Sequence, residues 1–144
     1  MPLTTFGAIM GFAAEISGKT AEIYGDLARK AKDTKLKEAL QTLSAEEVKT
    51  HALMGKTRRE NVTEMILEPV AGLRQEDYHL DVKVRDDMAD ADWLKGILAL
   101  EDREKRFFHD ASRKVPLPEV ARIFRKIAQK KEESLKALQG LKLS

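Results

Sequence analysis

The stretch ILALEDREKRFFHDASRK, residues 97–114, repeats apolar and acidic side chains at the three- and four-residue spacing of one helix face. That face carries Ile97, Glu101, Glu104, Phe108 and Ala111. An amphipathic helix turns its apolar line toward the core, because burial of apolar surface is what stabilises it. We therefore predict a helix over about 91–114 in which both glutamates point inward with the apolar residues.

Outward from this stretch, three further segments show the same periodicity. We predict one helix over about 5–31, a second that begins at Thr34, and a third that follows the Pro-Leu-Pro turn at 116–118. Asp33 and Thr34 supply the break and the N-cap before the second of these helices. Their inward lines are Phe12, Ile16, Thr20, Ile23, Tyr24 and Leu27; Leu36, Leu40, Leu43, Glu47, Thr50 and Met54; and Val120, Phe124, Ile127, Lys131, Ser134 and Leu138.

The lengths of the connections predict the topology. Short turns join the first helix to the second and the third to the fourth, so each pair should form an antiparallel hairpin. We predict an all-α, ferritin-like four-helix bundle forming one domain over 1–144, with hairpin one at about 5–59, a long crossover at about 60–90 and hairpin two at about 91–141. The crossover segment NVTEMILEPVAGL, residues 61–73, is predicted to form a short helix or to extend the second helix.

An internal repeat supports the two hairpins. Residues 11–54 align without a gap on residues 95–138, and the two short turns coincide. In this register Tyr24 pairs with Phe108 and Glu47 with Lys131. A duplicated helical hairpin explains the coincident turns, which periodicity alone does not require.

Composition excludes several classes of site. The chain has 144 residues, 26 Lys+Arg, 24 Asp+Glu and no cysteine, so thiolate metal sites, disulfides and cysteine nucleophiles are ruled out. No apolar run reaches the ~20 residues of a membrane span, and the start lacks a signal-peptide pattern, so we expect a cytoplasmic protein without membrane contact. The basic residues of the last helix, Arg122, Arg125, Lys126, Lys130 and Lys131, are interrupted by acids and lack stacking aromatics, so we expect no nucleic-acid binding.

The two hairpin sequences, residues 22–54 and 97–114, resemble the rubrerythrin branch of the ferritin-like superfamily. In that family a Glu on each first helix precedes an aromatic by seven residues, and each second helix carries a Glu-x-x-His pair. Here Ser17 and Glu101 stand at the two Glu positions, and Glu104 matches an additional Glu one turn later. The Glu-x-x-His pairs read Glu47 with Thr50 and Lys131 with Ser134.

The resemblance implies a di-iron site that has lost most of its ligands. Such a site takes glutamates from two helices and Glu-x-x-His motifs from the other two. Both histidines are absent, and an ammonium replaces one carboxylate. We predict that Lys131 takes the place of the metal charge and bridges Glu47 and Glu101. We expect the remaining carboxylate oxygens to accept hydrogen bonds from the hydroxyls of Ser17, Thr20, Thr50 and Ser134. At least one carboxylate should be protonated or in contact with water.

Two functional classes follow. In the first, the chain is a non-catalytic bundle with a degenerate site, no cofactor and a scaffold or interaction role. In the second, it is a metal-binding oxidoreductase or peroxidase, with iron held by the shifted set Glu47, His51, Glu101 and Glu104 and electrons from a separate donor. His51 lies four residues after Glu47, a spacing that a pair of metal ligands can have, although a histidine in such a place is more often an ordinary surface or boundary residue.

The start of the first helix carries an additional apolar face. Phe6, Ile9 and Met10, with the small residues Gly7 and Gly11, extend beyond what the second hairpin provides in the repeat. We expect a homodimer with its contact at this end, the alternative being core packing of a helix end.

Overall fold

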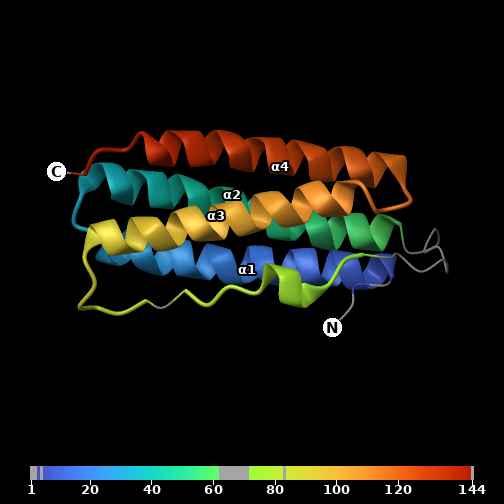
Figure 1. Ribbon diagram of the computed structural model, residues 1–144, viewed down its shortest axis with the longest axis horizontal. Coiled ribbons are helices and arrows are strands. Elements are labelled where there is room, and N and C mark those ends of the chain that lie inside the picture. Colours follow the sequence, from blue (N-terminus) through green and yellow to red (C-terminus); the bar gives the residue numbers. More distant parts are fainter. Residues whose placement is uncertain (1–2, 4, 62–71, 83, 144) are drawn as a thin grey trace.

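The computed structural model describes residue 3 and residues 5–61, 72–82 and 84–143, and its α-helices form a four-helix bundle (Figure 1). In chain order the helices are α1 (Phe6–Lys30), α2 (Thr34–Glu60), α3 (Asp90–Ser112) and α4 (Pro118–Gln139). A short 3-10 helix, η2 (Gln75–Tyr78), lies between α2 and α3. The all-helical prediction is confirmed for the described residues. The helix predicted within 61–73 lies almost wholly outside them.

Local signals set the helix ends where the sequence predicts them. The Thr5 side chain accepts a hydrogen bond from the backbone N–H of Ala8, and Asp33 accepts one from that of Leu36 at 3.0 Å. Both interactions satisfy donors that the first turn of a helix leaves free. Pro118 opens α4, where its missing N–H has no helical partner to lose.

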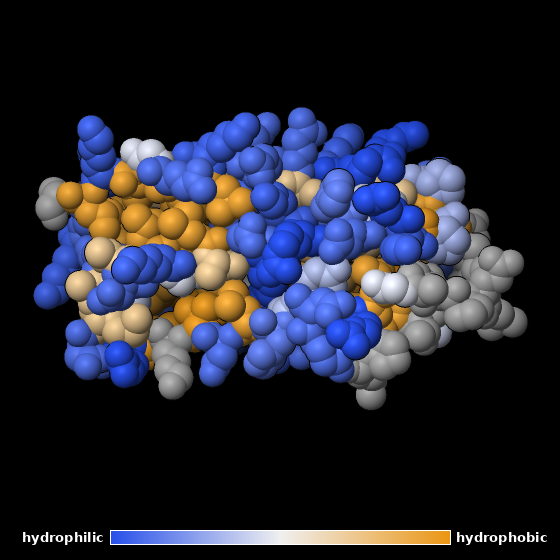
Figure 2. Space-filling model, viewed as in Figure 1, coloured by the Kyte–Doolittle hydropathy of each residue, from blue (hydrophilic) through white to orange (hydrophobic). Residues whose placement is uncertain are grey.

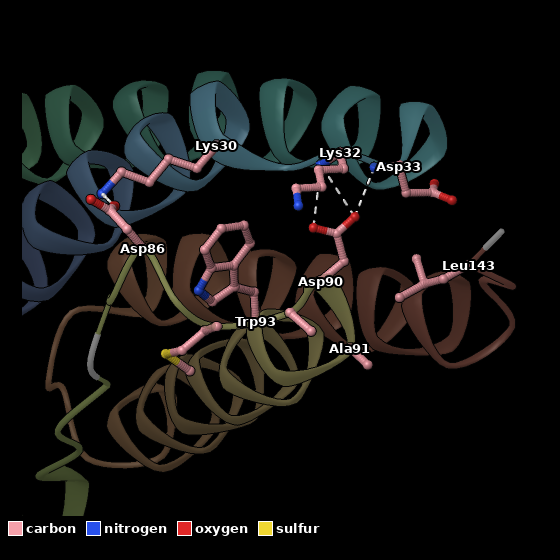
Figure 3. Close-up of a pocket in the computed structure, with 10 residues that line it drawn as sticks. Lys30, Lys32, Asp33, Asp86, Asp90, Ala91, Trp93 and Leu143 are labelled. Atoms are coloured by element: carbon pink, nitrogen blue, oxygen red, sulfur yellow. Dashed lines mark hydrogen bonds and ion pairs between the residues drawn. The ribbon is translucent and has the colours of Figure 1, made fainter.

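Helix contacts agree with two hairpins. α1 packs along α2 and α3 along α4, and between the hairpins the most extensive contact is that of α1 with α3 (Figure 1). The crossover runs along the α1 and α3 side, where the Tyr78 hydroxyl donates to Asp110 at 2.6 Å. At the far end of the bundle, Asp90 at the start of α3 accepts from the backbone N–H groups of Lys32 and Asp33 in the α1–α2 turn, at one side of a pocket of about 630 Å³ (Figure 3).

The core is divided into two apolar clusters. One is aromatic and contains Phe12, Tyr78, Phe107, Phe108 and Phe124 in edge-to-face and tilted contacts. The other is largely aliphatic and contains Tyr24, Leu27, Leu36, Leu40, Leu43, Trp93, Ile97, Leu100 and Leu138. Each helix contributes at least one buried polar residue between the two clusters, so a polar layer crosses the middle of the bundle.

The apolar start of α1 belongs to the first cluster. Phe6, Ile9 and Met10 are 2%, 0% and 0% exposed. Leu3 helps to cover them, and its backbone N–H donates to the carbonyl of Leu73 in the crossover. These side chains are therefore not available for a dimer contact. The predicted dimer surface was wrong because the crossover and the chain before α1, which the hairpin repeat does not include, cover this end.

On the face seen in Figure 2, apolar side chains gather at one end and hydrophilic side chains cover the centre. Among the residues described, the structure contains no helix with the length and apolar character needed to span a membrane.

Candidate buried charge cluster

The polar layer contains a cluster of four ionisable side chains, one each from α2 and α4 and two from α3. Glu47, Glu101 and Glu104 are fully buried and Lys131 is 6% exposed. The Lys131 ammonium donates a hydrogen bond to Oε1 of Glu47 and lies 2.8 Å from Oε2 of Glu101 and 2.9 Å from Oε2 of Glu104. The predicted bridge from Lys131 to Glu47 and Glu101 is confirmed, and Glu104 joins it as a third carboxylate.

Helix periodicity explains why these residues meet. Glu101 and Glu104 are three residues apart, so they lie on one face of α3 one turn from each other. Glu47 follows the apolar stripe of α2 and Lys131 that of α4. Each of the four residues occupies a core-facing position that an apolar residue would ordinarily hold, so the packing of the helices brings the four side chains together.

Burial and mutual repulsion shift the proton equilibria of two carboxyls. Burial, reinforced by hydrogen bonding to and repulsion from Glu104, raises the pKa of Glu47 from 4.5 to about 10, although Lys131 opposes the shift. Burial also raises the pKa of Glu101 to about 7, again against the attraction of Lys131. At neutral pH the environment of Glu47 therefore favours its protonated form. This agrees with the expectation that three carboxylates beside one ammonium do not all ionise.

The ammonium itself is held in its charged form. Burial alone would lower the pKa of Lys131, because it removes water from the charge. Glu104, Glu101 and Glu47 together outweigh that effect, and the pKa of Lys131 is raised. A permanent positive charge therefore lies at the centre of the bundle.

The hydroxyls near the cluster bond elsewhere. Ser17 Oγ donates to the carbonyl of Ala13 at 2.7 Å, and Thr50 Oγ1 donates to that of Glu46 at 3.1 Å. The expectation that these hydroxyls satisfy the carboxylates was therefore wrong, because Ser and Thr inside a helix readily bond the carbonyl one turn back.

Two further buried polar side chains lie beside the cluster: Arg103, which was missed at the level of sequence, and Tyr24, which was predicted to face inward. Arg103, 8% exposed, donates from Nη2 to Oγ1 of Thr20 at 3.1 Å. The Tyr24 hydroxyl is buried without a hydrogen-bond partner among the described residues, and burial together with the three glutamates raises its pKa well above 10. A signal for Arg103 existed, since it lies three residues after Leu100 and four before Phe107, both of which face the core.

The shifted ligand set is only partly brought together. Carboxylate oxygens of Glu47, Glu101 and Glu104 lie within 4.8 Å of one another, a spacing that could hold a metal ion. His51 is exposed, and its Nδ1 is 2.7 Å from the carbonyl oxygen of Ala14. Of the other histidines, His79 and His109 are also exposed.

The donor set fits poorly with a di-iron centre. Carboxylates alone remain, imidazole is missing, and the ammonium of Lys131 lies within ion-pair distance of all three acids. A divalent ion in the same position would meet the repulsion of that charge at close range.

Comparison with known proteins adds no relative. No protein-family model, no curated protein and no solved structure matches the chain.

Proposed function

We propose that this protein is a rubrerythrin-like, ferritin-like bundle in which a lysine has replaced the metal, and that it serves as a scaffold or interaction protein rather than as a redox enzyme. The observation that supports the proposal is the contact of Lys131 with Glu47, Glu101 and Glu104 in a fully buried layer. The family itself is proposed from the sequence resemblance and the four-helix arrangement.

Electrostatics favours this reading over a metal centre. A metal ion that bound the three carboxylates would have to displace the ammonium, which would then lie buried beside a divalent charge. Charges at such distances interact by several kcal/mol, ~4 kcal/mol for unit charges 4 Å apart at an effective dielectric constant of 20. The ammonium of Lys131 therefore compensates the charge of the inward carboxylates, which is the role of the metal in a complete site.

The experiment is a measurement of metal in protein purified without chelator, followed by thermal unfolding with added Fe(II), Mn(II) or Zn(II). We expect substoichiometric metal and no change in melting temperature at metal concentrations just above that of the protein. Stoichiometric metal, or a large increase in melting temperature, would contradict the proposal, because a ligand that binds only the native state stabilises it by mass action.

The second candidate is a metal-binding oxidoreductase or peroxidase. Only the proximity of the three carboxylates favours it. Iron would then be held by Glu47, Glu101 and Glu104 without His51, and electrons would come from a separate donor protein. The same metal titration distinguishes the two candidates.

A further inference from the structure

A groove lies between α2 and α4 on the outer side of the buried cluster. Its floor is apolar, formed by Leu53 of α2 and by Ile123 and Ile127 of α4, and its volume is about 280 Å³. Leu53 is 37% exposed, although most large apolar side chains among the described residues are buried. We refer to this feature as the α2–α4 groove.

Cations surround the apolar floor. Lys49 of α2 and Lys126 and Lys130 of α4 line the groove and are exposed, and Glu46 is the one acidic residue that lines it. Within the described part of the chain, these three lysines form no ion pair. Lys131 closes the inner wall, where its charge is matched by the buried glutamates. The groove therefore offers an apolar surface beneath a rim with a net positive charge.

The volume decides what kind of ligand fits. Small-molecule sites have volumes of ~300–1,000 Å³ and are mainly apolar with a few placed polar groups, so this groove is at the lower limit. Two turns of α-helix, ~10 Å across and ~11 Å long, occupy about 850 Å³, so only side chains of a partner helix, and not its backbone, would fit within it. A narrow, flexible chain fits into it.

We propose that the α2–α4 groove binds a free long-chain carboxylate, with the alkyl chain on Leu53, Ile123 and Ile127 and the carboxylate against the lysine rim. The charge of the rim selects an anion over a cation, and the apolar floor selects a chain over a small anion. This inference is independent of the proposed function, because it uses Lys131 only as a wall of the groove.

The test is calorimetric titration of the full chain with dodecanoate below its micellar concentration. We expect saturable binding of one dodecanoate per chain. Octanoate should bind at least tenfold more weakly, because each buried methylene contributes about fourfold in affinity. Dodecyltrimethylammonium, which has the same chain and the opposite charge, should not bind.

Matched variants locate the site. Leu53→Asp should weaken dodecanoate binding at least tenfold, whereas Val48→Asp should change it less than twofold, since Val48 is an exposed apolar residue of α2 that does not line the groove. The double variant Lys126→Glu/Lys130→Glu should also weaken binding tenfold or more, and Lys136→Glu, on α4 outside the groove, should not. Circular dichroism of each variant verifies that the helices are intact.

Several results would overturn the proposal. These are no binding of dodecanoate, equal binding of the cationic amphiphile, or equal losses in Leu53→Asp and Val48→Asp. Binding to phosphatidylglycerol vesicles or to an acidic helical peptide without binding of monomeric dodecanoate would assign the groove to a membrane surface or to a protein partner instead.

Discussion

Lys131 donates a hydrogen bond to Glu47 at the centre of the bundle, and the two residues are 84 residues apart in the chain. The same offset aligns hairpin one with hairpin two, so each of these residues is the repeat equivalent of the other. When two copies of a unit pack about a two-fold axis, a residue on the axis meets its own equivalent. Two glutamates there would repel each other, whereas Glu and Lys attract. If the two hairpins are repeats, a lysine at one of the two equivalent positions supplies a counter-charge from within the chain.

Substitution of Lys131 tests the energetic role of the internal cation. Lys131→Met should lower the free energy of unfolding at pH 7 by roughly 3 kcal/mol, because it leaves buried carboxylates without their counter-charge. Urea denaturation measures the change. Lys130→Met is the control, since Lys130 is the exposed neighbour and its loss should have an effect of a few tenths of a kcal/mol. Equal small effects in both variants would refute a stabilising role for Lys131.

The raised pKa values predict how stability depends on pH. The native state keeps the proton of Glu47, whose pKa is about 10, from pH 5 to 9, and keeps that of Glu101, whose pKa is about 7, only up to about pH 7. The unfolded chain has already lost both protons near pH 4.5. The native state then binds more protons than the unfolded state, so stability falls as pH rises.

The fall should be steeper from pH 5 to 7, where both groups contribute, than from pH 7 to 9, where only Glu47 does. Each contributes at most ~1.4 kcal/mol per pH unit. Urea denaturation across this range measures it, with Glu47→Gln as the control that keeps a neutral side chain of similar shape. We expect a shallower dependence above pH 7 in the variant; identical curves would mean that Glu47 is ionised in the native protein.

Reintroduction of ligands tests the resemblance to a di-iron site. The triple variant Thr50→His/Lys131→Glu/Ser134→His restores both Glu-x-x-His pairs and removes the internal cation. We expect its melting temperature to rise with Fe(II) or Zn(II) at concentrations just above that of the protein. Thr50→His/Ser134→His, which keeps Lys131, should respond much less. No response of the triple variant would argue against the family register on α2 and α4.

The burial of the α1 start predicts a structural role for Ile9. Ile9→Ala should lower the free energy of unfolding by about 2–4 kcal/mol, because it leaves a cavity beside fully buried neighbours. Light scattering should give the same mass for this variant as for the native chain, whose monomer is 16.2 kDa. A change from dimer to monomer in Ile9→Ala would restore this end of α1 as the dimer contact. The native mass also tests the expected homodimer itself.

Much of the fold could be predicted from the sequence, because the periodicity of a helix depends only on residues close together in the chain. The positions of Glu47, Glu101 and Lys131 on inward stripes follow from three- and four-residue spacings, and the Asp33 cap follows from its side-chain chemistry. The repeat gave the register between the two hairpins. These properties depend on neighbours in the chain or on the proposed repeat, both of which are visible in the sequence.

Other features of the site depend on the distances between helices, which only the tertiary structure gives. Whether Lys131 reaches Glu104 as well as Glu101 depends on how α4 packs on α3, and the burial of Arg103 depends on its approach to Thr20 across the bundle. The crossover covers the apolar start of α1 by tertiary contact, which no periodicity records. Sequence by itself determined the helices and placed Glu47, Glu101, Glu104 and Lys131 on inward faces. Packing determined the burial of Arg103 and the partner of each charge, because a side chain's partner is fixed by how closely the helices approach and not by its spacing along one of them.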